Sequence, residues 1–313
     1  MANYCRIILM GDPACFRIKA GANPHTRNRW GLRKTVDTDL ARRQWDIAAQ
    51  TFRDHGLRVE VIGAVEDCPG LVFPANAGFL LEKDQRVALS QKHFYLSHLL
   101  RARSAEKELY RKALSDLGLT VQELTPNIRF EGEADFFPAA EGFVLTYGNL
   151  IRPHWSTAMA WPPYRRVYGF RTDKAILEPL RALVPGRKIL ALELSQEAYY
   201  HGDTVLCAIG RKRDILLVHA QGLTPASLAR LKTDFTGRLL ILGDRDAMRF
   251  AANSFYVDNG REELLFCPDG LSDELFDELQ RANIRPVPLD VSEFFTKGGG
   301  SVKCMICDLG PGC

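Results

Sequence analysis

Short strand-like runs alternate with helical segments along this chain, and this alternation limits its fold more than any other feature. Apolar runs bounded by glycine or polar residues predict short strands, and longer segments that open with a cap, a proline or an acidic residue predict helices. Strands are expected at 1–10, 58–62, 142–148, 188–193, 204–209, 215–219 and 239–242, and helices at 38–55, 223–236, 246–252 and 272–282. This order predicts a mixed α/β fold and argues against one long βαβαβ winding.

Two segments that carry polar candidate residues have expected local structures of their own. Segment 68–79 is expected to run as a strand into a turn with Asn76 at its apex. Segment 199–206 is expected to be extended, which would place His201 and Asp203 on one face because side chains alternate along a strand. A histidine beside a carboxylate suits proton transfer, although a histidine satisfied within a core is the commoner outcome for such a pair.

The composition is that of a globular protein large enough for one domain spanning 1–313. The chain has 313 residues, of which 46% are hydrophobic and 25% charged. Its net charge of +3 is small and evenly spread, so no nucleic-acid partner is expected, and its apolar runs are too short to cross a membrane. Eight scattered cysteines without a visible secretory signal predict reduced thiols in a cytoplasmic enzyme.

A glycine-rich turn near the end of the sequence leads to a cysteine. Gly298, Gly299 and Gly300 are followed after three residues by Cys304. Consecutive glycines are costly to order and are accepted where the backbone must approach another group closely. A cysteine just after such a turn is expected to be presented for chemistry, and the alternative is a flexible tail that ends in a buried thiol.

The same cysteine opens a CxxC pattern with Cys307, and Cys313 lies nearby. A structural zinc site usually needs a second ligand pair at similar spacing, and none follows. We therefore expect no metal and no cofactor. A redox or zinc protein built on Cys304 and Cys307 remains an alternative class.

Segment 130–136, with the sequence FEGEADF, brings three acids among phenylalanines. A solvated acidic turn is the ordinary interpretation of such a segment. The flanking phenylalanines imply partial burial, where a carboxylate needs a partner.

Several motifs in a fixed order resemble those of the guanidino-group-modifying, or pentein, superfamily, and most of all its arginine dihydrolases. The motifs are Asn23-Pro24, VFPANAG at 72–78, FEGEADF at 130–136, YGFRTD at 168–173, YHGDT at 200–204, a DA…AAN segment at 246–253 and GGGSVKC at 298–304. The resemblance implies an α/β propeller of five pseudo-symmetric ββαβ blades around a central site. Segment 149–166, rich in aromatic residues, is expected to be an insertion or lid, and a well-packed surface loop is the alternative.

The resemblance also implies a role for each matching residue. Cys304 would be the nucleophile, His201 the general acid and base, and Glu131 the group that orients that histidine. Asp203 would bind the guanidinium, and Asn23, Arg171 and, with a poorer motif match, Arg103 would hold the amino-acid end of the substrate. The rest of the substrate-binding set would be Asn76, Asp135 and Ser301. The expected partner is a small guanidino compound.

Three positions refine the expected reaction. Asn76 stands where arginine deiminases have an aspartate, and an amide can hydrogen-bond a ureido carbonyl that a carboxylate would repel. Lys303 stands where deiminases tend to have histidine, and both features favour a dihydrolase that forms ornithine, CO2 and two NH3. Gly202 replaces a bulkier apolar residue, which is expected to widen the pocket or loosen the strand. The alternatives are a deiminase or dimethylargininase, then an amidinotransferase, and in another class a binding module without chemistry.

Overall fold

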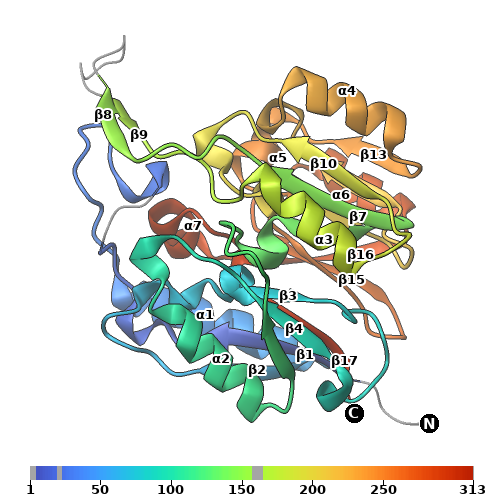
Figure 1. Cartoon of the computed structure of the whole chain (residues 1–313), viewed down its shortest axis with the longest axis horizontal. Helices are drawn as coiled ribbons and strands as arrows, with labels where there is room; N and C mark the ends of the chain where they lie inside the picture. The colour runs from blue at the N-terminus through green and yellow to red at the C-terminus, as the bar shows by residue number, and fades with distance from the viewer. Residues whose placement is uncertain (1–4, 20–22, 157–164, 313) are drawn as a thin grey trace.

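The computed structural model of the chain describes residues 5–19, 23–156 and 165–312. Within these residues the strands form five sheets of three strands each and one two-stranded hairpin, and the helices pack against the sheets (Figure 1). The expectation of a mixed α/β fold with many short strands is confirmed.

The five three-stranded sheets of the described residues share one design. The middle strand pairs antiparallel with one neighbour and parallel with the other. In strand order the sheets are β17 (Cys307–Gly312), β1 (Cys5–Gly11), β2 (Arg58–Ile62); β3 (Gly78–Leu80), β4 (His93–Leu96), β5 (Thr120–Glu123); β6 (Phe136–Ala139), β7 (Gly142–Tyr147), β10 (Ile189–Glu193); β11 (Leu206–Ile209), β12 (Ile215–Val218), β13 (Arg238–Ile241); and β14 (Phe255–Asp258), β15 (Glu263–Pro268), β16 (Ile284–Leu289).

A parallel neighbour requires a crossover connection, and in each sheet this crossover carries a helix. These helices are α1 (Thr38–Asp54), α2 (Glu106–Asp116), α3 (Leu177–Leu183), α4 (Pro225–Asp234) and α6 (Asp273–Arg281). Two more, α5 (Asp244–Met248) and α7 (Ser292–Gly298), lie in connections between sheets. Thr224 and Ser272 cap α4 and α6, since each side chain accepts a hydrogen bond from a first-turn backbone N–H.

One of the sheets joins the two ends of the described chain. Cys5 of β1 faces Gly312 of β17, and β1 pairs along its other edge with β2. The short turn that contains Cys304 comes directly before β17. The position of this cysteine therefore depends on pairing between strands about 300 residues apart.

Apolar side chains from neighbouring sheets pack on one another. Ile8 and Met10 of β1 belong to the same buried cluster as Val257 of β14 and Phe266 of β15. No helix in the described part of the chain is long and apolar enough to span a membrane.

Two expected strands near the site are replaced by tight turns. The segment before β11 is a 3-10 turn at Gly202–Thr204 that follows His201, and regular strand begins only at Leu206. The expected strand before Asn76 is a pair of 3-10 turns, Pro69–Val72 and Pro74–Ala77. Proline opens each of this pair, because its fixed φ suits the first position of a helical turn and its missing N–H is not needed there.

Part of the expected aromatic insertion forms the hairpin of β8 (His154–Ser156) and β9 (Arg165–Val167). The hairpin extends from one corner of the molecule (Figure 1), and Trp155 is half exposed. Trp161, Pro162 and Pro163 lie outside the described residues. None of the described hairpin residues lines the candidate site.

Candidate active site

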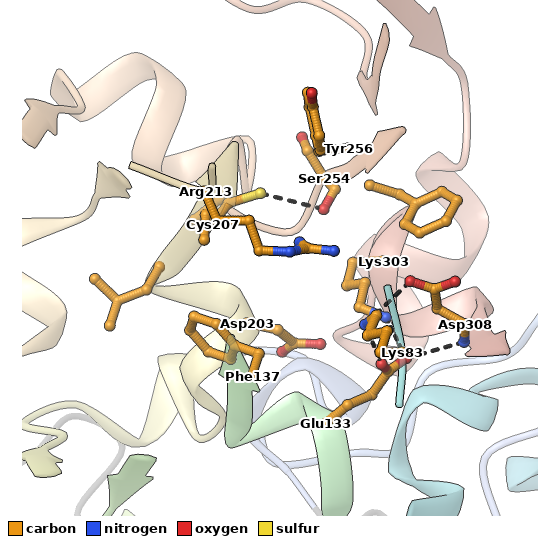
Figure 2. A pocket seen from close by; sticks show the side chains of 14 residues that line it. Lys83, Glu133, Phe137, Asp203, Cys207, Arg213, Ser254, Tyr256, Lys303 and Asp308 are labelled. Atoms are coloured by element: carbon orange, nitrogen blue, oxygen red, sulfur yellow. Dashed lines mark hydrogen bonds and ion pairs between the residues drawn. The ribbon is translucent and has the colours of Figure 1, made fainter. Parts of the chain in front are cut away.

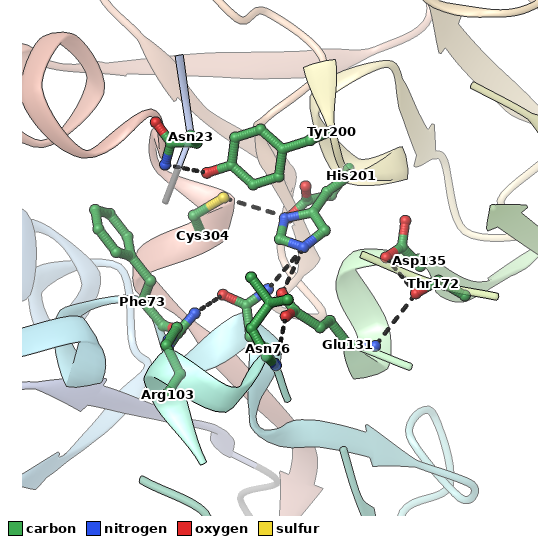
Figure 3. Close-up of polar contacts among 12 residues, drawn as sticks. Asn23, Phe73, Asn76, Arg103, Glu131, Asp135, Thr172, Tyr200, His201 and Cys304 are labelled. Atoms are coloured by element: carbon green, nitrogen blue, oxygen red, sulfur yellow. Dashed lines mark hydrogen bonds and ion pairs between the residues drawn. The ribbon is translucent and has the colours of Figure 1, made fainter. Parts of the chain in front are cut away.

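A cavity of about 300 Å³ collects most of the residues singled out in the sequence. Turns and loops between the strands line it rather than the strands themselves. Of the residues expected at the site, those that line it are Asn23, Asn76, Arg103, Glu131, Arg171, His201 and Cys304. Figure 3 shows that the His201 ring lies between the Cys304 thiol and the Glu131 carboxylate.

The glycine turn before Cys304 is needed because other groups lie very close. Gly299 ends α7 with a φ of +78°, in the left-handed region. A Cβ at Gly299 would lie 2.7 Å from the ring of His25, and one at Gly300 would lie 2.7 Å from the ring of Phe73. The expectation of close backbone approach is confirmed, and Cys304 is buried in the cavity wall.

Sequence reasoning missed Asn253 as a residue of the site. Its Nδ2 donates to Cys304 Sγ at 3.2 Å, and its Oδ1 accepts from the backbone N–H groups of Ser301 and Cys304. The expected helix 246–252 stops at Met248, and Phe250 then takes a φ of +59°. Residues 251–253, the AAN part of the motif, therefore form an irregular turn, and this turn places the Asn253 amide beside the Cys304 thiol.

His201 and Glu131 form a buried pair. His201 Nε2 lies 2.8 Å from Glu131 Oε2, and both side chains are almost fully buried. Burial alone would raise the pKa of Glu131, but the hydrogen bond and charge of His201 lower it to about 2. Burial likewise opposes the charged form of His201, and the carboxylates of Asp135 and Glu131 together raise its pKa above the usual value. Nδ1 is then the ring nitrogen left for the reacting groups.

Asp203 lies beside the thiol. Its Oδ2 is 3.5 Å from Cys304 Sγ, and no described residue gives its buried Oδ1 a hydrogen bond. Burial raises the pKa of Asp203 to about 6. Burial and the Asp203 carboxylate also raise the pKa of Cys304 well above its usual value, while the Asn253 hydrogen bond acts in the opposite direction. Without a cation in the cavity this thiol is held protonated.

Asp135 does not line the cavity, contrary to its expected contact with substrate. Its carboxylate accepts hydrogen bonds from the hydroxyls of Thr146 and Thr172 and from the backbone N–H of Gly202. The Asp135 carboxylate is fully buried behind the turn that follows His201. It is tolerated there because it accepts hydrogen bonds from these three buried donors. Asp135 thus supports the histidine rather than facing a ligand.

Gly202 packs against this network, so it neither widens the pocket nor loosens a strand as expected. A Cβ at this position would lie 2.1 Å from Thr146 Oγ1 and 2.7 Å from its Cγ2. The space that a side chain would need is filled by the threonine that donates to Asp135.

We expect Gly202→Ala to lower the free energy of unfolding by about 1–3 kcal/mol, the usual cost of overpacking a tight core. Displacing Thr146 would also break its bond to Asp135. Urea denaturation measures the change, and Gly63→Ala is the control because a Cβ at Gly63 meets nothing within 4 Å. A Gly202→Ala protein as stable as the parent would contradict this packing.

Asn23 and Arg171 both line the cavity, as expected. Asn23 Nδ2 donates to Tyr200 Oη at 3.1 Å and to the Gly298 carbonyl at 2.8 Å. The Arg171 guanidinium lies 4.8 Å above the Tyr200 ring. Both N–H groups of the Asn23 amide are thus used within the protein, and Arg171 provides a buried cation in the cavity wall.

Ser301 is fully buried and does not line the cavity, so the structure gives no support to its expected contact with substrate. Its backbone N–H holds Asn253 Oδ1 at 2.9 Å. Ser301 therefore helps to hold the backbone turn that precedes Cys304.

Lys303 lines a second, smaller cavity of about 40 Å³, shown in Figure 2. Its Nζ pairs with Glu133, which also pairs with Lys83 at 2.5 Å. Lys83 in turn lies 3.1 Å from Asp308. Asp203 lines this cavity too, and the Lys303 charge lowers the pKa of Asp203 against the effect of burial. Lys303 therefore acts on the site through Asp203 and not by contact with the main cavity.

The two cysteines of the CxxC pattern have different surroundings. Cys307 packs in an apolar cluster with Ile7 and Leu9, and both cysteines are free thiols. In the described residues no group of three or more histidine, cysteine or acidic side chains is placed to hold a metal ion.

Comparisons with known proteins were made on sequence and on structure. No family model matches the chain. It is 26% identical over 304 residues to the N(G),N(G)-dimethylarginine dimethylaminohydrolase of Mycobacterium tuberculosis, covering 96% of this chain and 85% of that protein. It is 27% identical over 267 residues to the bifunctional arginine dihydrolase/ornithine cyclodeaminase AgrE of a Nostoc species, covering 85% of this chain but only 33% of AgrE.

Solved structures have the same fold. The N-terminal domain of ArgZ, an arginine dihydrolase bound to its substrate, superposes with a TM-score of 0.79 at 21% identity, covering 97% of this chain and 98% of that one. A dimethylarginine dimethylaminohydrolase adduct gives a TM-score of 0.66 at 15% identity, with 97% and 99% covered.

Proposed function

We propose that this chain, a homologue of these dimethylarginine and arginine hydrolases and a member of their guanidino-group-modifying superfamily, is a cysteine-dependent arginine dihydrolase. The observation that carries the proposal is the convergence of four groups at one point. The Cys304 thiol and the His201–Glu131 pair line the main cavity, and the Asp203 carboxylate, which lines the smaller cavity, lies 3.5 Å from that thiol.

The first half of the proposed reaction follows from these contacts. A guanidinium cation gripped by Asp203 places positive charge beside the thiol, which opposes the high pKa that burial and Asp203 give Cys304. The ionising thiol releases its proton to water, Cys304 Sγ attacks the guanidino carbon, and protonated His201 gives its proton to the departing ammonia. A thiouronium remains on the cysteine, and water deprotonated by His201 releases the ureide and frees the thiol.

The second half repeats the attack on the ureide carbonyl. Its amino group leaves as ammonia and an S-carbamoyl cysteine forms. Water then releases the carbamate of ornithine, which loses CO2. The proposed products are thus ornithine, one CO2 and two NH3, with no redox change and no co-substrate other than water.

Incubation of the purified chain with arginine, with separate quantitation of ornithine, citrulline and ammonia, tests the proposal. We expect ornithine and ammonia in a ratio of one to two. Citrulline as the sole product would replace the dihydrolase by a deiminase, and turnover only of methylated arginine would favour the activity named for the Mycobacterium tuberculosis relative. Absence of any product, together with an unreactive Cys304, would favour a binding module.

The change Asn76→Asp is expected to leave citrulline as the main product. Asn76 lines the cavity, and a carboxylate there would attract the guanidinium but repel the ureide oxygen. The ratio of ornithine to citrulline should fall at least about tenfold, the effect of one exchanged hydrogen bond. Asn149→Asp, at an exposed loop position, is the control. Ornithine formation that survives Asn76→Asp would contradict the role of this amide.

We also infer that the five sheets are the blades of one pseudo-fivefold propeller that forms a single domain. The repeated strand order and the sheet shared by β1 and β17 support this arrangement. The free cysteines of the described chain suit the reducing conditions of a cytoplasm.

A further inference from the structure

Arg103 was expected to hold the substrate's amino-acid end, but its guanidinium is already engaged. Its Nε and Nη2 donate to the carboxylate of Glu106 at 3.0 and 2.6 Å, and Nη2 also donates to the carbonyls of Gly70 and Phe73. Glu106 is 2% exposed. If Arg103 swung toward a substrate carboxylate, it would leave this buried acid without its partner, which is costly.

The remaining guanidinium nitrogen of Arg103 contacts Asn76. Arg103 Nη1 donates to Asn76 Oδ1 at 2.5 Å, as Figure 3 shows. A guanidinium has five N–H donors and no acceptor, so this contact admits only one orientation of the amide. The oxygen of Asn76 must face Arg103, and the NH2 group must face the other way.

The other side of Asn76 is the catalytic centre. Its Nδ2 lies 3.5 Å from His201 Nε2, and that ring nitrogen is already bonded to Glu131. The amide therefore presents N–H donors to the cavity. A guanidinium offers only donors in return, whereas a ureide offers a carbonyl oxygen that accepts them.

We propose that the buried Arg103–Glu106 pair determines product specificity by locking Asn76 as a donor to the ureide oxygen. This inference rests on the proposed dihydrolase function and deepens it. A donor on that oxygen holds the ureide and stabilises the negative charge that develops there when Cys304 attacks a second time. Arg103 and Glu106 are positioning residues, because they reach the ureide only through Asn76.

The test removes the pair without leaving a buried charge. In Arg103→Met/Glu106→Leu, Asn76 is free to turn its amide. We expect the ratio of ornithine to citrulline formed from arginine to fall at least about tenfold, as for the loss of one oriented hydrogen bond. Consumption of arginine should fall much less. Arg101→Met is the matched control, because Arg101 lies exposed in the same 3-10 turn and does not line the cavity.

Two further measurements guard against misfolding. Thermal unfolding verifies that Arg103→Met/Glu106→Leu and Arg101→Met are folded. Calorimetry with the double change placed in a Cys304→Ala chain should show at least about tenfold weaker binding of citrulline, with little change for arginine.

The outcomes separate the two proposals. A parent enzyme that forms ornithine beside folded variants with an unchanged product ratio and unchanged citrulline affinity overturns the role of the pair alone. A raised KM for arginine with an unchanged product ratio also overturns it, because Arg103 would then bind the substrate carboxylate. A parent that forms only citrulline overturns the dihydrolase function, and unchanged citrulline binding in the variants would still refute the role of the pair.

Discussion

Replacement of Cys304 by serine is expected to lower kcat/KM for arginine by about 10⁴- to 10⁶-fold, the usual cost of removing a catalytic nucleophile. Guanidinium carbon is a weak electrophile, and a serine hydroxyl is a weaker acid and a poorer nucleophile than a cysteine thiol in the same position. The thiol can ionise when the substrate cation offsets the burial and the Asp203 charge that raise its pKa. Formation of ornithine and citrulline measures the change.

Cys307→Ala is the matched control for this experiment. Cys307 is the other cysteine of the CxxC pattern but packs among apolar side chains. Its replacement should cost about 1 kcal/mol of stability through the small cavity it leaves, with the reaction rate retained. Equal loss of activity in both variants would favour a dithiol or metal site. Retention of more than a hundredth of the activity by Cys304→Ser would contradict its role as nucleophile.

Glu131→Gln is expected to lower kcat by about 10³- to 10⁴-fold, the size of effect seen when the residue that orients a catalytic histidine is made neutral. The amide keeps the shape of the side chain but removes the negative charge that stabilises protonated His201. Protonation of the leaving ammonia by His201 then becomes rarer at neutral pH. Glu178→Gln, on the exposed face of α3, is the control.

The pH profile distinguishes this role from a structural one. Glu131 helps to raise the pKa of His201, so its removal lowers that pKa and His201 loses its proton at a lower pH. The basic limb of the kcat profile, which needs protonated His201, should therefore move to lower pH in Glu131→Gln. A uniform loss with an unmoved basic limb would indicate damage to the fold instead.

The chemistry-bearing residues could be selected from the sequence because they occur in short motifs. The structure brings Cys304, His201, Glu131 and Asp203 together. The tertiary fold does so, because the strand that was expected to carry both His201 and Asp203 is a 3-10 turn. The turn at Gly202 could not be predicted, since it depends on Thr146 and Asp135 from another sheet.

Residues that act by orientation were harder to predict. Asn253 directly follows segment 246–252, which the sequence predicts to be a helix, and only its tertiary contacts show that its amide donates to the thiol. Arg103 has the charge expected of a carboxylate-binding residue, yet the acid three positions later occupies it. The sequence can show that a cationic residue belongs near the active site. It does not show whether the partner of that residue is a ligand or another side chain of the protein.

The pairing of β1 with β17 makes catalysis sensitive to events at the ends of the described chain. Both strands are buried along most of their length, and Cys307 and Leu309 pack in the same apolar cluster as Ile7 and Leu9. Cys304 comes just before β17, so any change that separates these strands would displace the nucleophile and disrupt this cluster together. Loss of product formation should therefore accompany loss of core packing, and the two can be followed in one denaturation experiment.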